Sequence, residues 1–179
     1  MKNKNHPIFD YRKKKIKVNE KKIEALVKEL IEKLKARKFF LGIMESCTGG
    51  GMANVITNIP GASDVFKGGI VAYSTEIKKI FGVPKELIKK YSVYSPQVAL
   101  AMAKQVRKIL KTDIGLSVTG SISRLDPKNI GSKVGRVDAA VIFRKKTLTR
   151  RFYFPNLKQR SAIKAMIIYQ VLKMIREII

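Results

Sequence analysis

Three short polar segments carry the side chains with which this chain could do chemistry. They are Glu45–Gly50, Tyr73–Lys78 and Ser117–Gly120, and each lies at the end of an apolar run. Hydroxyls, a thiol, carboxylates and a lysine gather there, and glycines in the first segment would let a ligand approach the backbone closely. Because ligands of open α/β sheets bind beyond the carboxyl ends of the strands, the three segments predict one shared site. For the first segment, an ordinary capped helix start after a strand is the alternative.

The sequence contains a single histidine, His6, and a single cysteine, Cys47. These counts argue against a histidine base, a metal held by several histidines, an intramolecular disulfide and a multi-cysteine zinc site. We therefore expect no metal and no cofactor. Cys47 lies beside Ser46 and could be a thiol nucleophile, but without a histidine partner it is better explained as a small buried residue.

The elements that would position these segments follow from hydrophobic periodicity. Strands are predicted over residues 39–44, 69–73 and 114–118, and a hairpin over 137–143 and 148–154. Helices are predicted from residue 19 to about 34, from 52, over 76–81, from 84, over 96–110 and over 159–178. Strands that alternate with helices and end in an antiparallel pair predict an α/β fold, a three-layer α/β/α sandwich with a mixed, mostly parallel sheet.

The chain has 179 residues, with 38 lysines and arginines against 13 aspartates and glutamates, and a formal net charge of +25. This length suits one domain, so we expect a basic, disordered tail over residues 1–18 and a single domain over residues 19–179. A membrane-spanning helix would need an apolar run of about 20 residues, which the sequence lacks, and no signal-peptide core is visible. Together with the single cysteine, these features predict a cytoplasmic protein.

The positive charge would attract polyanions such as nucleic acid, anionic lipid or phosphorylated small molecules. Basic residues form clusters along the whole chain, at 12–15, 21–22, 89–90 and 144–146. This spread favours the solvated faces of many elements over one binding groove, and no nucleic-acid-binding motif is recognisable. A basic nucleic-acid-binding protein stays an alternative, and we expect no membrane partner.

Four motifs follow one another along the chain: Glu-Ser-Cys-Thr-Gly-Gly at 45–50, Ile-Pro-Gly-Ala-Ser at 59–63, Gly-Gly-Ile-Val-Ala-Tyr-Ser at 68–74 and Ser-Val-Thr-Gly at 117–120. In this order and spacing they resemble the CinA C-terminal domain family, the nicotinamide mononucleotide deamidases, over about residues 20–178. Full-length members also carry a molybdopterin-binding-like domain, so the chain resembles the stand-alone form. The resemblance implies an α/β/α sandwich and a homodimer. It also implies hydrolysis of the carboxamide of nicotinamide mononucleotide to nicotinate mononucleotide and ammonia, in NAD salvage.

The resemblance also implies roles for individual residues. Ser46 matches the family's nucleophile and Lys78 the base that would take its proton. A lysine can act as a base only if burial or nearby positive charge lowers its pKa. Tyr73 matches a tyrosine that positions the pair or relays a proton, and Thr119 a hydroxyl that orients the substrate. The plainer alternatives are a tyrosine that caps a strand and one more solvated lysine.

Further contacts are implied around this pair. Backbone amides after Ser46 would stabilise the tetrahedral oxyanion, which is typically worth about 3 kcal/mol per donor. Glu45 would orient Lys78 or the helix start, or would only cap that helix. The remaining expected substrate-binding residues are Thr48, Gly49, Gly50, Gly120, Arg124 and Lys158.

Two segments depart from the family pattern. Family members follow the third strand with a Gly-Ile-Ala-Gly-Pro loop, where this chain has bulkier residues over 120–127. The change would reshape or close the nucleotide pocket, or Arg124 would supply a phosphate contact by its side chain. After the last strand, Lys158 replaces a family arginine and keeps a point charge without the bidentate fork, for which Arg160 could compensate. A catalytically degenerate nucleotide-binding homologue is therefore a second alternative.

Overall fold

A computed structural model describes residues 7–13, 18–127, 129 and 132–179 of the chain. At its centre lies a six-stranded sheet with the strand order β1-β6-β5-β4-β2-β3. The strands are β1 (Ile8–Asp10), β2 (Leu41–Glu45), β3 (Phe66–Val71), β4 (Ile114–Ser121), β5 (Arg136–Phe143) and β6 (Lys146–Tyr153). The β1/β6, β2/β3 and β2/β4 pairs are parallel, whereas β4/β5 and β5/β6 are antiparallel. The sheet is mixed and mostly parallel, as predicted.

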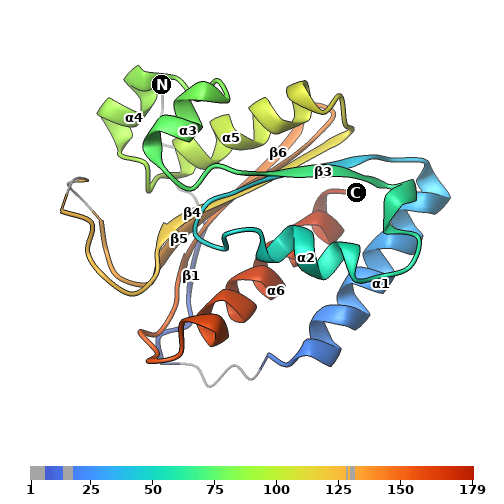
Figure 1. The fold of residues 1–179 in the computed structure, drawn as a ribbon, viewed down its shortest axis with the longest axis horizontal. Helices are drawn as coiled ribbons and strands as arrows, with labels where there is room; N and C mark the ends of the chain where they lie inside the picture. Colours follow the sequence, from blue (N-terminus) through green and yellow to red (C-terminus); the bar gives the residue numbers. More distant parts are fainter. Residues whose placement is uncertain (1–6, 14–17, 128, 130–131) are drawn as a thin grey trace.

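Helices cover both faces of this sheet (Figure 1). One face carries α1 (Glu20–Arg37), α2 (Gly51–Thr57) and α6 (Arg160–Ile178), and the other carries α3 (Thr75–Ile80), α4 (Lys85–Tyr91) and α5 (Pro96–Ile109). A short 3₁₀ turn, Ala62–Asp64, precedes β3. The predicted three-layer α/β/α sandwich is confirmed.

Local sequence signals begin several of these helices. Asn19, Ser74 and Ser95 each stand just before a helix, and their side-chain oxygens accept hydrogen bonds from the backbone amides of Lys22 (3.0 Å), Ile77 (3.2 Å) and Val98 (3.2 Å). Such caps satisfy amide groups that have no partner inside the first turn of a helix. The Ser74 cap fixes where α3 begins and therefore where Lys78, one turn later, is placed.

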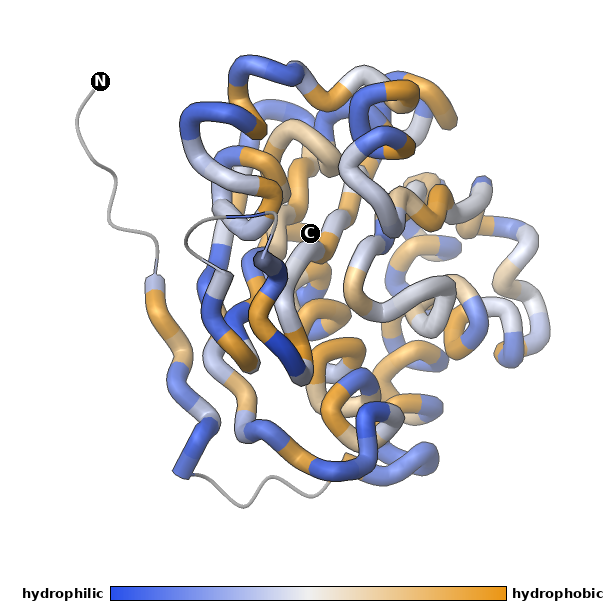
Figure 2. Tube along the Cα trace, turned by 60° about the vertical axis from the view of Figure 1, so that its left-hand side comes forward, coloured by the Kyte–Doolittle hydropathy of each residue, from blue (hydrophilic) through white to orange (hydrophobic). Residues whose placement is uncertain are grey.

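Hydrophobic cores form on both faces of the sheet. The larger core holds the apolar sides of α1, α2 and α6 against the sheet, and the smaller ones hold α3, α4 and α5. Figure 2 shows apolar segments inside the molecule and hydrophilic segments at its surface. Strands β4 and β5 are buried almost throughout, since helices pack on both of their faces. Among the described helices, none is long and apolar enough to cross a membrane.

The predicted disordered tail over residues 1–18 is wrong where the structure describes it. Residues 8–10 form β1, which pairs with residues 151–153 of β6. The rings of Phe9 and Tyr11 lie 5.6 Å from those of Phe152 and Phe154, respectively. Two aromatic residues among many lysines are too few to show a strand pattern, so this pairing could not be predicted from the sequence. Residues 1–6, with His6, and residues 14–17 lie outside the described part.

Candidate active site

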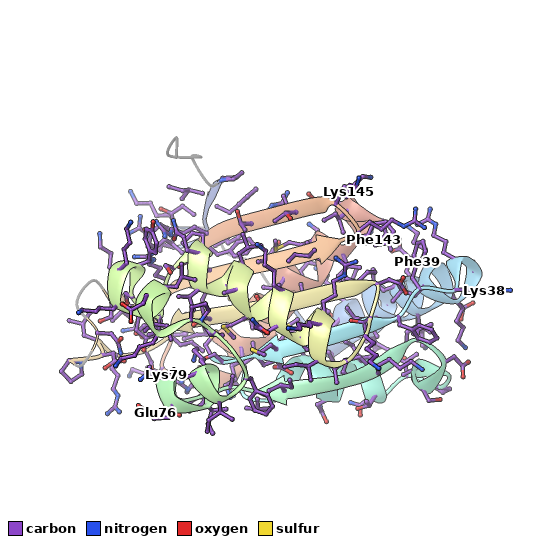
Figure 3. The ribbon with its side chains drawn as sticks, turned by 90° about the horizontal axis from the view of Figure 1, so that it is seen from above. Lys38, Phe39, Glu76, Lys79, Phe143 and Lys145 are labelled. Atoms are coloured by element: carbon purple, nitrogen blue, oxygen red, sulfur yellow. The ribbon has the colours of Figure 1, made fainter. Side chains whose placement is uncertain are left out.

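The three polar segments meet at one cleft, of about 720 Å³, beyond the carboxyl ends of β2, β3 and β4. Ser46 and Cys47 line it after β2, the segment from Tyr73 to Lys78 after β3, and Gly120 at the end of β4. The loop after β4 and Arg160 of α6 complete the lining. Figure 3 shows Glu76 and Lys79 of α3 at this end of the molecule. The three segments therefore converge as predicted, and residues 120–127 of the altered loop line the cleft with them.

Ser46 and Lys78 form a direct hydrogen bond in this cleft. The Nζ of Lys78 lies 2.9 Å from the Oγ of Ser46, although 32 residues separate them in the chain. The same ammonium group donates to the carbonyl oxygens of Ala72 (2.7 Å) and Tyr73 (3.4 Å). The Ser46 amide donates to the Val118 carbonyl at 3.0 Å, which fixes the serine backbone to the end of β4. The predicted pair is within proton-transfer distance.

Burial sets the electrostatics of the lysine. Only 2% of Lys78 and 5% of Ser46 are exposed. Loss of hydration lowers the pKa of Lys78 from its ordinary value of 10.5 to about 8, while the neighbouring Cys47 and Glu76 act in the opposite direction. Of the two causes that the sequence left open, burial accounts for the shift, and the positive charge of the protein is not among its causes.

Cys47 lines the cleft but is a poor nucleophile. It is 3% exposed, and burial raises the pKa of its thiol to about 12. A thiol with that pKa stays protonated at neutral pH, and the thiolate is the nucleophilic form. Of the two interpretations of Cys47, the small buried residue fits the structure.

Glu45 organises the turn that presents Ser46. Its fully buried carboxylate accepts hydrogen bonds from the Thr48 hydroxyl (2.6 Å) and from the amides of Met52 (3.0 Å) and Ala53 (2.9 Å). Glu45 therefore caps the start of α2 and is not bonded to Lys78. The expectation that Thr48 binds substrate is not met, because its hydroxyl points into this buried network and the residue does not line the cleft.

The two glycines of this turn shape it and do not line the cleft. Gly49 and Gly50 have φ angles of 63° and 91°, a left-handed conformation that side chains other than glycine rarely adopt. The start of α2 does not supply free amides as expected, since Glu45 takes two of them. The backbone amide of Cys47, just before the glycines, lies within hydrogen-bond reach of its own thiol.

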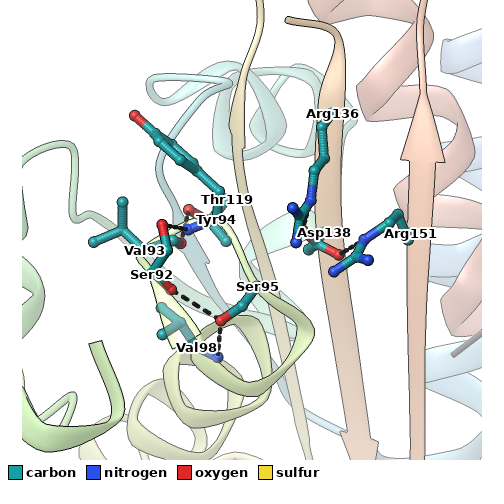
Figure 4. A network of polar contacts seen from close by, with 9 residues as sticks. All are labelled: Ser92, Val93, Tyr94, Ser95, Val98, Thr119, Arg136, Asp138 and Arg151. Atoms are coloured by element: carbon teal, nitrogen blue, oxygen red, sulfur yellow. Dashed lines mark hydrogen bonds and ion pairs between the residues drawn. The ribbon is translucent and has the colours of Figure 1, made fainter. Parts of the chain in front are cut away.

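Thr119 supports the wall of the cleft from behind. It is fully buried, and its hydroxyl donates to the Val93 carbonyl at 2.9 Å (Figure 4). Asp138, its register partner on β5, is also fully buried and pairs with Arg136 (3.1 Å) and Arg151 (2.8 Å). The expected substrate contact of Thr119 is not observed, because the hydroxyl holds the segment before α5 against β4.

A tyrosine and an aspartate in the cleft were not predicted from the sequence. The Tyr94 hydroxyl donates to Asp126 Oδ2 at 2.7 Å, and the side-chain amide of Asn129 donates to the same oxygen at 2.6 Å. The backbone amide of Asp126 donates to the Ser132 hydroxyl at 2.9 Å. These bonds hold the altered loop beside the cleft. No local signal links Tyr94 to a loop residue 32 positions away.

Arginines stand at the mouth of the cleft. Arg124 and Arg160 both line it, and Arg160 donates to the Ser123 hydroxyl and, at 3.5 Å, to the Tyr73 hydroxyl. Tyr73 thus faces the mouth with its phenol, which is exposed, and meets Lys78 only through its carbonyl oxygen. Lys158 is exposed and does not line the cleft, so of the two candidates after the last strand the structure brings Arg160 to the site.

Comparisons with known proteins all point to one family. Residues 23–179 match the family described as the CinA C-terminal domain. A CinA-like protein of Thermotoga maritima is 37% identical over 154 residues, which cover 83% of this chain and 36% of that protein. A CinA-like protein of Thermotoga neapolitana is 42% identical over 104 residues, 58% of this chain and 25% of that protein. The chain thus spans between a quarter and about a third of the length of these curated relatives.

Solved structures share the fold. The competence/damage inducible protein CihA from Agrobacterium tumefaciens is 27% identical and superposes with a TM-score of 0.80, covering 87% of this chain and 94% of that chain. A CinA superfamily protein from Escherichia coli, 23% identical, reaches a TM-score of 0.82 and covers 94% and 97%. The names of these proteins state a family and no reaction.

Proposed function

Because the chain belongs to the CinA C-terminal domain family, we propose that it is an amidohydrolase that converts nicotinamide mononucleotide to nicotinate mononucleotide and ammonia. The observation that carries the proposal is the Ser46–Lys78 pair, with 2.9 Å between Oγ and Nζ in an open cleft. A serine hydroxyl is a weak nucleophile until a neighbouring base takes its proton. The lowered pKa of Lys78, about 8, leaves part of this lysine neutral and able to act as that base at neutral pH.

The carbonyls around Lys78 favour this role. A neutral amine has two N–H bonds and one lone pair. The carbonyl oxygens of Ala72 and Tyr73 can take the two N–H bonds, which turns the lone pair toward the Ser46 hydroxyl. The pair is thereby oriented for proton transfer from oxygen to nitrogen without a histidine.

Hydrolysis then proceeds in two halves. Ser46 Oγ attacks the carboxamide carbon while its proton passes to Lys78. The C–N bond of the tetrahedral adduct breaks, and the lysine gives this proton to the departing nitrogen, which leaves as ammonia. Water adds to the resulting ester, passing a proton to Lys78, and the carboxylic acid leaves as Ser46 recovers its proton. The backbone amides of the turn that follows Ser46 are the candidate donors to the oxyanion of both adducts.

The mouth of the cleft suits a phosphorylated substrate. Arg124 and Arg160 both line it, and guanidinium groups bind phosphate through paired N–H donors. Arg124 would replace by its side chain a contact that a glycine loop makes by its backbone. Arg160, held by Ser123 and Tyr73, would be positioned before the ligand arrives.

Ammonia release from purified protein tests the proposal. Nicotinamide mononucleotide, its riboside and free nicotinamide are compared in parallel, with Ser46→Ala and Lys78→Ala as inactive variants. Lys79→Ala is the matched control, since Lys79 is the exposed neighbour of Lys78 on α3. We expect turnover of the mononucleotide by wild type and by Lys79→Ala only.

Two outcomes would overturn the proposal. Full turnover by Ser46→Ala would remove the serine from the reaction. Thermal stabilisation of the wild type by the mononucleotide, with no ammonia from any of the three compounds, would instead identify a nucleotide-binding homologue without catalysis.

A further inference from the structure

A second hollow, of about 480 Å³, lies at the end of the sheet opposite the cleft. Its basic lining residues are Lys104, Arg107, Lys108, Lys111 and Arg144, joined by Thr112, Ile142 and Thr147. Thr112 stands just before β4 and Ser121 at its far end, so the length of an eight-residue strand, about 25 Å, separates the hollow from the cleft. Nothing in the proposed reaction uses this site.

The hollow is lined by cations without an acidic residue among its described lining. Lys104, Lys108 and Lys111 are exposed on or just after α5, and Arg144 is exposed on the turn between β5 and β6. None of these side chains forms an ion pair within the described part of the chain. Arg107 and Lys108 also occupy the last turn of α5, where cations offset the helix dipole. Lys104 and Lys111 have no such structural role, and the mutual repulsion of the cations around the hollow favours a bound anion.

Arg107 holds the two sides of the hollow together. Its guanidinium donates to the Thr112 carbonyl (3.3 Å) and to the Arg144 carbonyl (3.0 Å), and so ties the end of α5 to the turn between β5 and β6. The two rims of the hollow are thereby held at a fixed separation. A charged ligand would meet cations on both rims without first ordering them.

Positive charge continues from the hollow along this end of the molecule. Further exposed cations there are Arg37, Lys38, Lys67, Lys145 and Lys146. The ring contact between Phe39 and Phe143, 4.8 Å between centroids, brings the end of α1 beside the end of β5. Figure 3 shows Lys38, Phe39, Phe143 and Lys145 at this end, far from Glu76 and Lys79 at the other. The spread of lysines along the sequence therefore does not exclude one basic surface, because separate segments converge here.

We propose that this basic end, centred on the hollow between α5 and the β5–β6 turn, binds the phosphodiester backbone of nucleic acid without sequence preference. Lys104 and Lys108 on α5 and Lys111 just after it form a row of about 10 Å, longer than one phosphate group. A nucleic-acid strand carries one negative charge every 3–4 Å or so along its axis and can contact such a row. Three or more simultaneous phosphate contacts are therefore available.

Two features favour nucleic acid over an anionic membrane and backbone contacts over base contacts. Among the large apolar side chains exposed in the described chain, Ile109 alone lies on these elements, whereas membrane-surface segments insert several apolar residues. The faces of Phe39 and Phe143 are covered by the Arg144 guanidinium at 5.2 and 5.1 Å, and Phe40 is covered by Lys67 at 3.9 Å. Rings covered in this way do not offer a platform for stacked bases.

Fluorescence anisotropy with labelled DNA of about 20 nucleotides, single-stranded and duplex, tests the proposal over a range of salt concentrations. The variant is the triple Lys104→Gln, Lys108→Gln and Lys111→Gln. Its matched control is Lys85→Gln, Lys89→Gln and Lys90→Gln, which removes three exposed lysines from α4 near the cleft. All six side chains are exposed, so both triples are expected to fold, which circular dichroism and thermal melting check.

We expect the α5 triple to lower affinity at least about tenfold and to reduce the slope of log affinity against log salt by about 2–3, the number of lost phosphate contacts. The α4 triple should change affinity less than about threefold. Equal losses in both triples would show that net charge alone drives binding and would overturn the proposal. It would also be overturned by a wild type that binds neither DNA, or that binds vesicles containing phosphatidylserine through the α5 lysines while ignoring DNA.

Discussion

The two ends of the sheet use the same side chain in opposite ways. At the cleft, Lys78 is buried, touches two carbonyl oxygens and a serine, and has a pKa lowered to about 8. At the hollow, Lys104, Lys108 and Lys111 are exposed and face solvent. Desolvation turns the first lysine into a candidate base, whereas hydrated ammonium groups act as point charges. Burial, and not residue type or net charge, decides which chemistry a lysine in this chain performs.

The charged residues that line the cleft and the hollow differ as well. The cleft mixes Arg124 and Arg160 with Glu76 and Asp126, which suits the small polar substrate proposed for it. The described lining of the hollow contains cations and no carboxylate, which suits a long polyanion and offers little selectivity. The net charge of +25 therefore describes the second site better than the first.

The largest expected difference in activity between the two ends comes from replacing one lysine at each end by arginine. Lys78→Arg keeps a positive charge but removes the base, because a guanidinium does not lose its proton in proteins. We expect ammonia release from nicotinamide mononucleotide to fall by about 10³-fold, within the range for loss of a general base. Lys108→Arg should leave both ammonia release and DNA affinity unchanged. If Lys78→Arg keeps activity within about tenfold of wild type, Lys78 acts as a charge, and the contrast disappears.

The pH profile gives the next largest effect. Lys78 must be neutral to accept the serine proton, and its pKa is about 8. Well below that pH the neutral fraction falls about tenfold per pH unit, so kcat/KM should drop by about 50-fold from pH 8 to pH 6 and level off above pH 9 or so. DNA binding at the hollow should stay nearly constant over the same range. A flat kcat/KM profile between pH 6 and pH 8 would contradict the assignment of Lys78 as the base.

Stability should also depend on pH through Lys78 and not through the exposed lysines. The unfolded chain holds the Lys78 proton up to about pH 10.5, whereas the folded protein releases it near pH 8. The unfolded state therefore binds more protons between these values, and the free energy of unfolding rises with pH across this window by about 3 kcal/mol. Chemical denaturation should show the wild type gaining about 3 kcal/mol relative to Lys78→Met across this window, whereas Lys108→Met keeps a constant difference from wild type. Parallel curves for Lys78→Met would mean that its pKa is not lowered.

The convergence of the polar segments at one site could be predicted from the order of strands and polar residues along the chain. Strand ends that carry polar residues must meet at one edge of a parallel sheet, so the convergence of Ser46 and Lys78 could be predicted. The direction of the Thr119 hydroxyl could not be, because β4 is buried on both faces and shows no alternation that separates a cleft side from a core side. Thr48 was misassigned for a related reason: the buried carboxylate of Glu45 competes for its hydroxyl at 2.6 Å.

Contacts between segments far apart in the chain could not be predicted from the sequence. The bond between Tyr94 and Asp126, the pairing of β1 with β6 and the gathering of cations at the hollow join segments that share no periodic signal. In the last case, charge clusters spaced along the chain looked like separate solvated faces. They become one surface only because the end of α5, the end of α1 and the β5–β6 turn lie at the same end of the sheet.

The smallest predicted effect is a difference in KM between a variant of a cation that lines the cleft and a variant of a cation outside the lining. Arg124 lines the mouth, and Arg124→Ala should raise KM for nicotinamide mononucleotide about tenfold, about 1.4 kcal/mol of lost binding, with kcat changed little. The riboside, which lacks the phosphate, should show no such increase. Lys158 is exposed and outside the lining, so Lys158→Ala should change KM by less than about twofold. An equal rise in KM for both variants would mean that the general positive field, and not a contact with Arg124, attracts the phosphate. The cleft would then attract anions in the same unspecific way as the hollow.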